Sequence, residues 1–217
     1  MTLKILLADD HTIFREGLRK LLQSHPGMDI IGAAGDGRTA VELAKKLKPD
    51  IVVMDIGMPD LNGISATQQI HQENPSSKVI ALSMHSDWRF VSGMLQAGAS
   101  GYLLKDCAFN ELVTAIQAVA AGNFYLAPTM LNSVLDKFLS SASLPGQTPA
   151  HILSPREREI LQLLSEGKTV KRIAHLLGIS IKTVETHHNN IMKKLDIHSI
   201  AELTKFAIRE GLTGLGG

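Results

Sequence analysis

Five polar side chains stand where short apolar segments end, and their types could support phosphoryl chemistry: Asp9, Asp10, Asp55, Ser83 and Lys105. The apolar segments that lead into them cover residues 5–8, 51–54, 79–82 and 101–104. Short apolar runs bounded by breaking residues are typical of buried parallel strands. Because the carboxyl ends of parallel strands meet at one edge of an open sheet, we expect the three acids, the hydroxyl and the lysine to converge there.

The three acids predict a site for a divalent cation. Carboxylates that lie close together are costly unless a cation lies between them. Mg²⁺ suits such a site, because it binds through a few carboxylates, waters and a phosphate oxygen. We expect Asp10 and Asp55 to be direct ligands and Asp9 to bind directly or through water. The backbone carbonyl of Gly57, two residues past Asp55, would complete the site.

The same residues predict a reaction at Asp55. With its charge compensated by a cation, this carboxylate could attack a phosphoryl group and form an acyl phosphate. Lys105 would neutralise the phosphoryl oxygens, and Ser83 would hydrogen bond to one of them. Taken singly, a strand-end Asp is usually a cap and a lone Lys is usually a solvated charge. The prediction therefore depends on all five residues occurring at matching strand ends.

Strands and helices alternate along residues 4–125 and must position these side chains. Strands are predicted near 4–8, 29–34, 51–55, 79–83 and 101–104. Helices are predicted near 12–24, 38–47, 63–73, 87–97 and 109–121. This alternation predicts an α/β doubly wound, flavodoxin-like fold with five parallel strands, and right-handed crossovers would place helices on both faces of the sheet.

The rest of the chain changes character after this α/β domain, which we assign to residues 1–125. Residues 126–149 are predicted to be a linker, rich in Ser, Pro and Gly at 140–149, with a short helix near 128–139. Residues 150–217 contain only helical patterns, beginning at Ser154-Pro155 with Glu157 as a capping partner and continuing at 169–177, 181–195 and 199–210. The glycine-containing turn at 176–180 indicates a small all-α helix-turn-helix domain of four helices.

Composition and charge limit the class of protein. Residues 1–125 contain 11 Lys and Arg against 13 Asp and Glu, whereas residues 150–217 contain 10 against 7, so the second half is the better match for a polyanion. The single cysteine, Cys107, excludes an internal disulfide and predicts an inert thiol. No apolar run approaches 18 residues and no signal peptide is visible, which favours a cytoplasmic protein without membrane contact.

The segment 181–195 has the pattern of a DNA recognition helix. At 100° per residue, Val184, Ile191 and Leu195 form one apolar stripe that should be buried. The opposite and flanking positions are basic or amide-rich, which suits contacts to phosphates and base edges, although the pattern also fits an ordinary solvated face. The predicted DNA contacts are Lys182, Thr183, Glu185, Thr186, Asn189, Asn190 and Lys193.

The N-terminal motifs resemble the signature of the two-component response-regulator receiver domain over roughly residues 3–120. The segments that carry the resemblance are Asp9-Asp10, Met54-Asp55-Ile56-Gly57-Met58-Pro59, Ser83 and Leu104-Lys105. The resemblance implies that Asp55 accepts phosphate from a sensor histidine kinase and that Mg²⁺ is required. It also implies that Ser83 and Tyr102 form a switch, in which the hydroxyl moves toward the phosphate and the ring turns inward.

The C-terminal motifs resemble the LuxR-type helix-turn-helix over about residues 150–214. They are Leu153-Ser154-Pro155-Arg156-Glu157-Arg158-Glu159, residues 173–180 and residues 182–187. With the receiver, the whole chain is similar to a NarL/FixJ-type response regulator. That resemblance implies that helix 181–195 reads double-stranded DNA and that helix 199–210 forms a homodimer surface, used when the protein is phosphorylated or on DNA. Val170 and Arg172 stand where many relatives have Asn and Glu, and Glu185 stands where some have Lys.

These observations predict a phosphorylation-controlled transcriptional regulator that is not a turnover enzyme. Phosphorylation is expected to reshape the surface of helices 87–97 and 109–121, and the resemblance implies that this change frees the C-terminal domain to dimerise. One rival is a phosphatase with Asp55 as nucleophile, but its general acid would stand where the chain has Gly57. A second rival is a DNA-binding regulator that keeps the receiver fold without phosphorylation. A dinucleotide site at residues 35–40 fits the loose G-x-G-x-x-A pattern but leaves the acid cluster unexplained.

Overall fold

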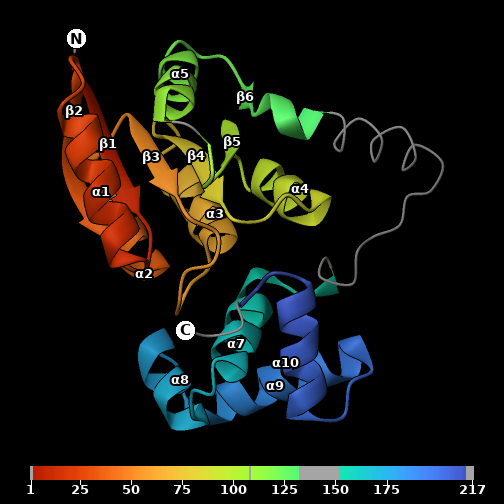
Figure 1. Ribbon diagram of the computed structural model, residues 1–217. Coiled ribbons are helices and arrows are strands. Elements are labelled where there is room, and N and C mark those ends of the chain that lie inside the picture. The colour runs from red at the N-terminus through yellow and green to blue at the C-terminus, as the bar shows by residue number, and fades with distance from the viewer. Residues whose placement is uncertain (1, 108, 132–151, 214–217) are drawn as a thin grey trace.

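Six parallel strands form one sheet in the N-terminal part of the computed structural model, which describes residues 2–107, 109–131 and 152–213 (Figure 1). The spatial order is β2-β1-β3-β4-β5-β6. The strands are β1 Leu3–Ala8, β2 Met28–Ala34, β3 Ile51–Met54, β4 Lys78–Ser83, β5 Gly101–Leu104 and β6 Tyr125–Leu126. The first five confirm the predicted strands, whereas β6 was not predicted.

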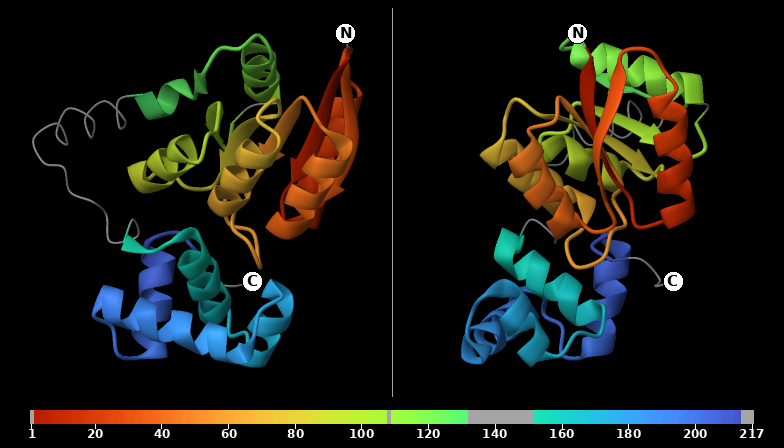
Figure 2. Two further views of the ribbon diagram at one scale, coloured as in Figure 1. Left: turned by 180° about the vertical axis from the view of Figure 1, so that it is seen from behind. Right: turned by 90° about the vertical axis from the view of Figure 1, so that its left-hand side faces the viewer.

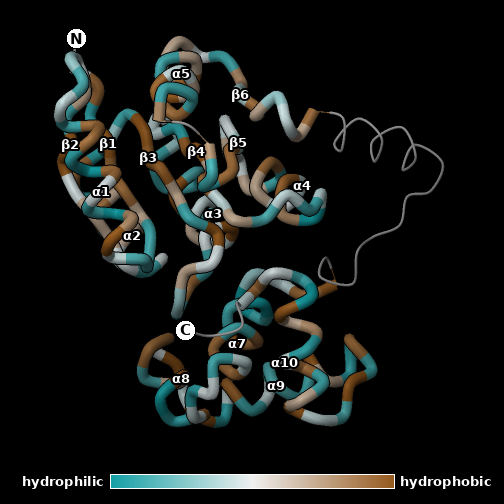
Figure 3. Tube along the Cα trace, viewed as in Figure 1, coloured by the Kyte–Doolittle hydropathy of each residue, from teal (hydrophilic) through white to brown (hydrophobic). Residues whose placement is uncertain are grey.

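Helices cover both faces of this sheet. They are α1 Thr12–Gln23, α2 Gly37–Leu47, α3 Gly63–Glu73, α4 Trp88–Gln96 and α5 Phe109–Ala120. Alternate strand residues divide between two buried clusters, one shared with α2, α3 and α4 and the other shared with α1 and α5. Strand β3 is buried on both faces and is hydrophobic along its whole length (Figure 3). The predicted doubly wound α/β fold is therefore confirmed.

The strand register brings the predicted site residues to one edge of the sheet. Ala8 of β1 lies opposite Met54 of β3, so both strands end at the same level. The Asp55 N–H then donates to the Ala8 carbonyl at 2.8 Å. In the same way, the Lys105 N–H donates to the Ser83 carbonyl at 2.8 Å. These backbone bonds fix the directions from which the side chains enter the site.

The segment after α5 adds the sixth strand. Tyr125 pairs with Gly101, and the Ala127 N–H donates to the Tyr102 carbonyl at 3.1 Å. Ala127 and Met130 are each 2% exposed and belong to the core of the α/β domain. The first residues of the predicted linker 126–149 thus pack with the sheet. Most of that linker, and of the helix predicted at 128–139, lies outside the described residues.

The described helices of the C-terminal part are α7 Pro155–Ser165, α8 Val170–Leu177, α9 Ile181–Leu195 and α10 Ile200–Arg209. Ser154 and Glu157 form the predicted capping box at the start of α7. Gly167 and Gly178 adopt left-handed conformations, with φ of 76° and 62°, where α7 and α8 end. Val184 and Ile191 are fully buried and Leu195 packs against the same core, which confirms the predicted stripe on α9. Within the described residues, no helix is both long and apolar enough to cross a membrane.

Candidate functional site

The three predicted acids lie together at the carboxyl edge of the sheet. Asp9 and Asp10 follow β1 and Asp55 follows β3, and their carboxylate oxygens lie within 4.8 Å of one another. Asp9 and Asp55 are buried, whereas Asp10 is partly exposed. The arrangement therefore provides several carboxylate oxygens in a small space that is open to solvent on the Asp10 side.

Lys105 joins two of these acids. Its ammonium nitrogen lies 2.8 Å from Asp9 Oδ2 and 2.8 Å from Asp55 Oδ2, and its side chain is only 6% exposed. Burial by itself would lower the pKa of Lys105, but the carboxylates of Asp55 and Asp9 outweigh burial and raise it. The lysine consequently stays positively charged beside the carboxylate predicted to accept a phosphoryl group.

The acid cluster suits a divalent cation. Burial raises the pKa of Asp10, the nearby Asp55 and Asp9 carboxylates raise it further, and His11 acts in the opposite direction. Asp10 Oδ1 accepts no hydrogen bond from the described part of the chain, although His11 Nδ1 lies 2.8 Å away. A cation would relieve both the repulsion and the unsatisfied oxygen. Gly57 is exposed in the loop after β3, and its N–H lies 3.4 Å from Asp55 Oδ1.

Ser83 and Tyr102 lie on the neighbouring strands β4 and β5, where Ser83 is opposite Leu104 and Tyr102 is opposite Ala81. Ser83 is fully buried, and its Oγ accepts a hydrogen bond from the His85 N–H at 3.0 Å. Tyr102 is also fully buried, and its hydroxyl donates to the His85 carbonyl at 2.7 Å. Burial raises the pKa of Tyr102 to about 12, so its hydroxyl remains protonated at neutral pH. The tyrosine ring is therefore already turned inward in this arrangement.

His11 is a site residue that the sequence analysis did not single out. Its Nδ1 lies 2.8 Å from Asp10 Oδ1, 3.3 Å from Asp9 Oδ1 and 3.4 Å from Lys105 Nζ. The available signal was its position directly after the acid pair at the end of β1. Burial raises the pKa of the Cys107 thiol, close to the same edge, to about 11, which favours the predicted inert thiol.

The predicted DNA contacts share one feature, which is that their side chains are exposed on α9. The exposed residues are Lys182, Thr183, Glu185, Thr186, Asn189, Asn190 and Lys193. Helix α9 begins after Ser180, whose hydroxyl accepts a hydrogen bond from the Thr183 N–H at 3.1 Å. The Thr186 hydroxyl donates to the Lys182 carbonyl at 2.8 Å. In Figures 1 and 2, α7 lies between α9 and the sheet domain.

Comparisons with protein families divide the chain in two. A family model described as the response regulator receiver domain matches residues 5–117. A second family model, described as bacterial regulatory proteins of the luxR family, matches residues 151–207. The first match contains the acid cluster, Ser83, Tyr102 and Lys105, and the second contains the whole of α8 and α9.

Individual relatives match along nearly the whole chain. The transcriptional regulatory protein DegU of Brevibacillus brevis is 35% identical, with 96% of this chain and 94% of the relative covered. The transcriptional regulatory protein LiaR of Bacillus subtilis strain 168 is 40% identical, with 97% and 99% covered. A solved structure of two RcsB dimers bound to two parallel DNAs is 26% identical, covers 95% of this chain and 98% of its own, and superposes with a TM-score of 0.59.

Proposed function

Because the chain belongs to the response regulators that combine a receiver domain with a LuxR-type DNA-binding domain, we propose that Asp55 is its phosphoacceptor and that α9 reads the DNA. The observation that carries the first part is the convergence of Asp9, Asp55 and Lys105 within hydrogen-bond distance at one sheet edge. The observation that carries the second part is the exposed, basic and amide-rich face of α9.

The proposed reaction is phosphoryl transfer from a phosphohistidine of a sensor histidine kinase. A carboxylate oxygen of Asp55 attacks the phosphorus, and the P–O bond forms as the P–N bond breaks. The histidine nitrogen keeps the electron pair of the broken bond and takes a proton. Lys105 Nζ already lies 2.8 Å from Asp55 Oδ2, so its ammonium group is close enough to contact the phosphoryl oxygens and to stabilise their negative charge. Water later cleaves the acyl phosphate, and Asp55 acts only in its own phosphorylation and dephosphorylation.

We propose Mg²⁺ as the cation, held by Asp10, Asp55 and the Gly57 carbonyl, with Asp9 as a direct or water-mediated ligand. The donor set supports this choice, because carboxylate and carbonyl oxygens are the ligands that Mg²⁺ prefers. When bound, the cation neutralises phosphoryl oxygens during transfer. The chain's own residues orient the acceptor: the Ile56 N–H donates to Asp55 Oδ1 at 2.7 Å and holds the carboxylate in place.

We propose that Ser83 and Tyr102 are the residues that sense the acyl phosphate. Ser83 Oγ can rotate from the His85 N–H toward a phosphoryl oxygen without leaving the buried edge. Tyr102 shares His85 as a partner, so a shift of the His85 backbone moves both side chains together. In the described structure the tyrosine ring is inside already, and the switch would act through its hydrogen bond and not through a large swing of the ring.

Double-stranded DNA, a histidine kinase and a second copy of this chain are the proposed partners. The kinase is implied by the receiver domain, and the dimer is supported by the related RcsB structure, which holds two RcsB dimers on DNA. Helix α10 is the proposed dimer surface. A regulator that binds chromosomal DNA works where the chromosome lies, so we place it in the cytoplasm.

The test compares DNA binding of wild type and Asp55→Asn, each with and without phosphoramidate and Mg²⁺. The probe is a set of duplexes selected from a random pool by the phosphoramidate-treated wild type. We expect the donor to tighten binding by wild type and by Asp29→Asn, an exposed control on β2, but not by Asp55→Asn. Equal binding by all three variants under both conditions would support the phosphorylation-independent regulator. Catalytic turnover of phosphate esters by wild type would instead support the alternative that the protein is a phosphatase with Asp55 as nucleophile.

A further inference from the structure

Glu185 is the only acidic residue of α9, and it stands among the predicted DNA contacts. Its side chain is exposed, and it is the fifth residue of the helix. Val184, directly before it, is 0% exposed and packs in the core of the C-terminal domain. The buried Val184 fixes the rotation of α9 on the domain. Glu185 therefore presents its carboxylate to solvent from a helix whose orientation is set by the core.

The residues around Glu185 have a different character. At about 100° per residue, Glu185, Asn189 and Lys182 lie within about 60° of one another around the helix axis. All three are exposed. Amides and lysines suit base edges and phosphates, whereas a carboxylate repels the phosphates that the lysines attract. An acid at this position consequently weakens binding to DNA in general, unless it finds a hydrogen-bond donor there.

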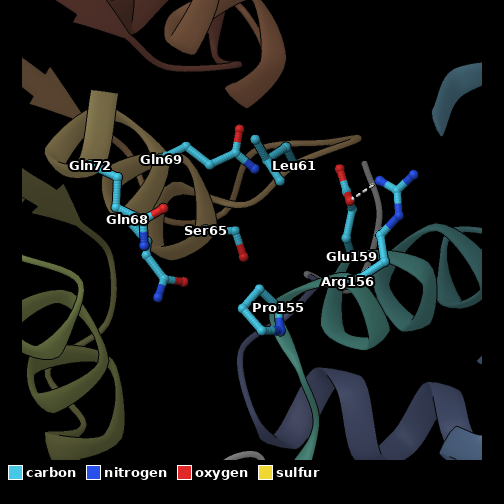
Figure 4. A pocket seen from close by; sticks show the side chains of 8 residues that line it. All are labelled: Leu61, Ser65, Gln68, Gln69, Gln72, Pro155, Arg156 and Glu159. Atoms are coloured by element: carbon cyan, nitrogen blue, oxygen red, sulfur yellow. Dashed lines mark hydrogen bonds and ion pairs between the residues drawn. The ribbon is translucent and has the colours of Figure 1, made fainter. Parts of the chain in front are cut away.

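Glu185 also differs from the other glutamates of the C-terminal domain. Each of those accepts a hydrogen bond or forms an ion pair, as Glu159 does with Arg156 at 2.6 Å (Figure 4). They are Glu157, Glu159, Glu166, Glu202 and Glu210. Within residues 2–107, 109–131 and 152–213, the Glu185 carboxylate has neither kind of contact. No intramolecular contact in that part of the chain therefore accounts for the acid on α9.

The major groove of DNA limits the partners that a carboxylate can have there. An ionised carboxylate only accepts hydrogen bonds. Guanine presents two acceptors, N7 and O6, and thymine presents the O4 acceptor and a methyl group, so neither offers a donor. Adenine offers the N6 donor but places the N7 acceptor beside it, whereas cytosine offers the N4 amino donor alone. Cytosine is therefore the base whose edge suits a carboxylate best.

We propose that Glu185 is a specificity-determining residue of α9, which accepts a hydrogen bond from the N4 amino group of one cytosine in each half-site. The carboxylate also rejects guanine and thymine at that position, because it would face their acceptor atoms with no donor between them. Lys182 and Lys193 supply the attraction to phosphates that lets the helix carry an acid. This inference rests on the proposed DNA-reading role of α9 and is independent of phosphorylation at Asp55.

Asn189, one turn beyond Glu185, provides an internal comparison. Four residues of α-helix span about 6 Å along the axis, which is close to two base-pair steps of about 3.4 Å. Glu185 and Asn189 consequently face different base pairs when α9 lies along the groove. The Asn189 amide both donates and accepts, which suits N6 and N7 of adenine. Loss of one side chain should therefore change the preference at one position and leave the other in place.

The first experiment selects duplexes from a random pool with the full chain, with phosphoramidate and Mg²⁺ present throughout. The proteins are wild type, Glu185→Ala, Asn189→Ala and Glu42→Ala. Glu42 is exposed on α2 of the receiver, so its substitution removes the same charge from a different domain. We expect wild type, Asn189→Ala and Glu42→Ala to select cytosine at one shared position of each half-site. Glu185→Ala should lose this preference and keep the rest of the site.

The second experiment tests the N4 contact itself, by fluorescence anisotropy of single duplexes. The selected cytosine is replaced by N4-methylcytosine, which still pairs with guanine but carries a methyl group in place of the N–H in the major groove. We expect this change to weaken binding by wild type by about 10-fold and by Glu185→Ala by less than about 2-fold. Glu185→Lys should instead prefer guanine at that position, because its ammonium group donates to O6 and N7.

Circular dichroism establishes that each variant is folded, and the remaining outcomes separate the inference from the proposed function. If Glu185→Ala selects the same bases as wild type at every position, the inference is overturned and the proposed DNA binding stands. Equal losses with N4-methylcytosine for wild type and Glu185→Ala would also overturn it, because the effect would then lie in the duplex. If wild type selects no duplex from the pool, the proposed function of α9 fails together with the inference.

Discussion

At the scale of single residues, the proposed reaction depends most directly on the positive charge of Lys105. The ammonium group contacts Asp9 and Asp55 and keeps its charge despite burial, because the two carboxylates raise its pKa. We predict that Lys105→Met slows phosphorylation by phosphoramidate by about 100-fold or more, as expected when a buried group that stabilises developing charge is removed. The measurement is the rate of phosphoprotein formation at saturating Mg²⁺.

A matched control is Lys78→Met, since Lys78 is exposed at the start of β4 and far along that strand from Ser83. It should phosphorylate at the wild-type rate. Should Lys105→Met and Lys78→Met react equally fast, Lys105 has no part in charge neutralisation. Lys105→Arg is not a suitable charge-conserving control, because its planar guanidinium group would not reproduce the two contacts that the compact ammonium group makes.

At the scale of elements, the start of α7 depends on an ionised glutamate. Burial tends to raise the pKa of Glu157, but Lys194 and the N-terminal capping groups of Ser154 outweigh it, so the pKa is lowered. Glu157 accepts from the Ser154 N–H and from Lys194 Nζ, both at 2.7 Å. A lowered carboxyl pKa stabilises the folded state above the ordinary glutamate value of about 4.3, and this stabilisation is lost as pH falls through the folded-state pKa.

We therefore predict that Glu157→Gln destabilises the C-terminal domain by about 1 kcal/mol at pH 7, a modest value because Lys194 is partly exposed. The difference between variant and wild type should shrink toward zero as pH falls below the folded-state pKa. Urea unfolding followed through NMR signals of α9 measures this difference at each pH. A difference that stays constant with pH would mean that the carboxylate charge is not the cause.

The short strand β6 gives a second prediction at this scale. Met130, just past β6, is 2% exposed and packs in the core of the receiver, although the sequence pattern placed it in a linker. We predict that Met130→Ala destabilises the receiver by about 2 kcal/mol or more, the usual result of removing a buried methionine side chain. Leu131→Ala, at a neighbouring position that is 49% exposed, should change stability by no more than about 0.5 kcal/mol. Urea unfolding followed by Trp88 fluorescence reports both, and equal effects would contradict the packing of Met130.

The elements also show what could and could not be predicted from the sequence. Buried parallel strands have continuous apolar runs, so the sequence shows where the strands that precede Asp9, Asp55 and Lys105 end. Because parallel strands end at the same edge of a sheet, the contacts among these three side chains could also be predicted. Tyr125–Leu126 is too short to display a period, and β6 was missed. Gln162 and Asn62 are buried polar residues that meet across 100 positions, and nothing local distinguishes them from exposed amides. The place of His11 in the site depends on the direction of its side chain, which residue spacing alone does not predict.

At the scale of the whole molecule, the position of α9 decides how DNA binding can be controlled. The receiver contacts α7 and the segment just past α10, where the Asn62 amide donates to the Leu212 carbonyl at 3.4 Å. The α9 face remains exposed in the same arrangement. Control through the relative placement of the two domains, and thus through pairing of protomers, fits this geometry better than a shield over α9.

This arrangement makes a prediction about salt. Each lysine that neutralises a DNA phosphate adds close to one unit to the slope of log affinity against log salt concentration. We predict that Lys182→Ala and Lys193→Ala each reduce that slope by about 1, and do so equally with and without phosphoramidate, because both side chains are already exposed on α9 while the receiver contacts α7. Lys45→Ala, an exposed change on the receiver, should leave the slope unchanged. Fluorescence anisotropy of a labelled duplex over a salt series measures each slope. If the two substitutions reduced the slope only after phosphoramidate treatment, the α9 face would have to be covered in the unphosphorylated protein. That outcome would contradict the exposed α9 face of this structure.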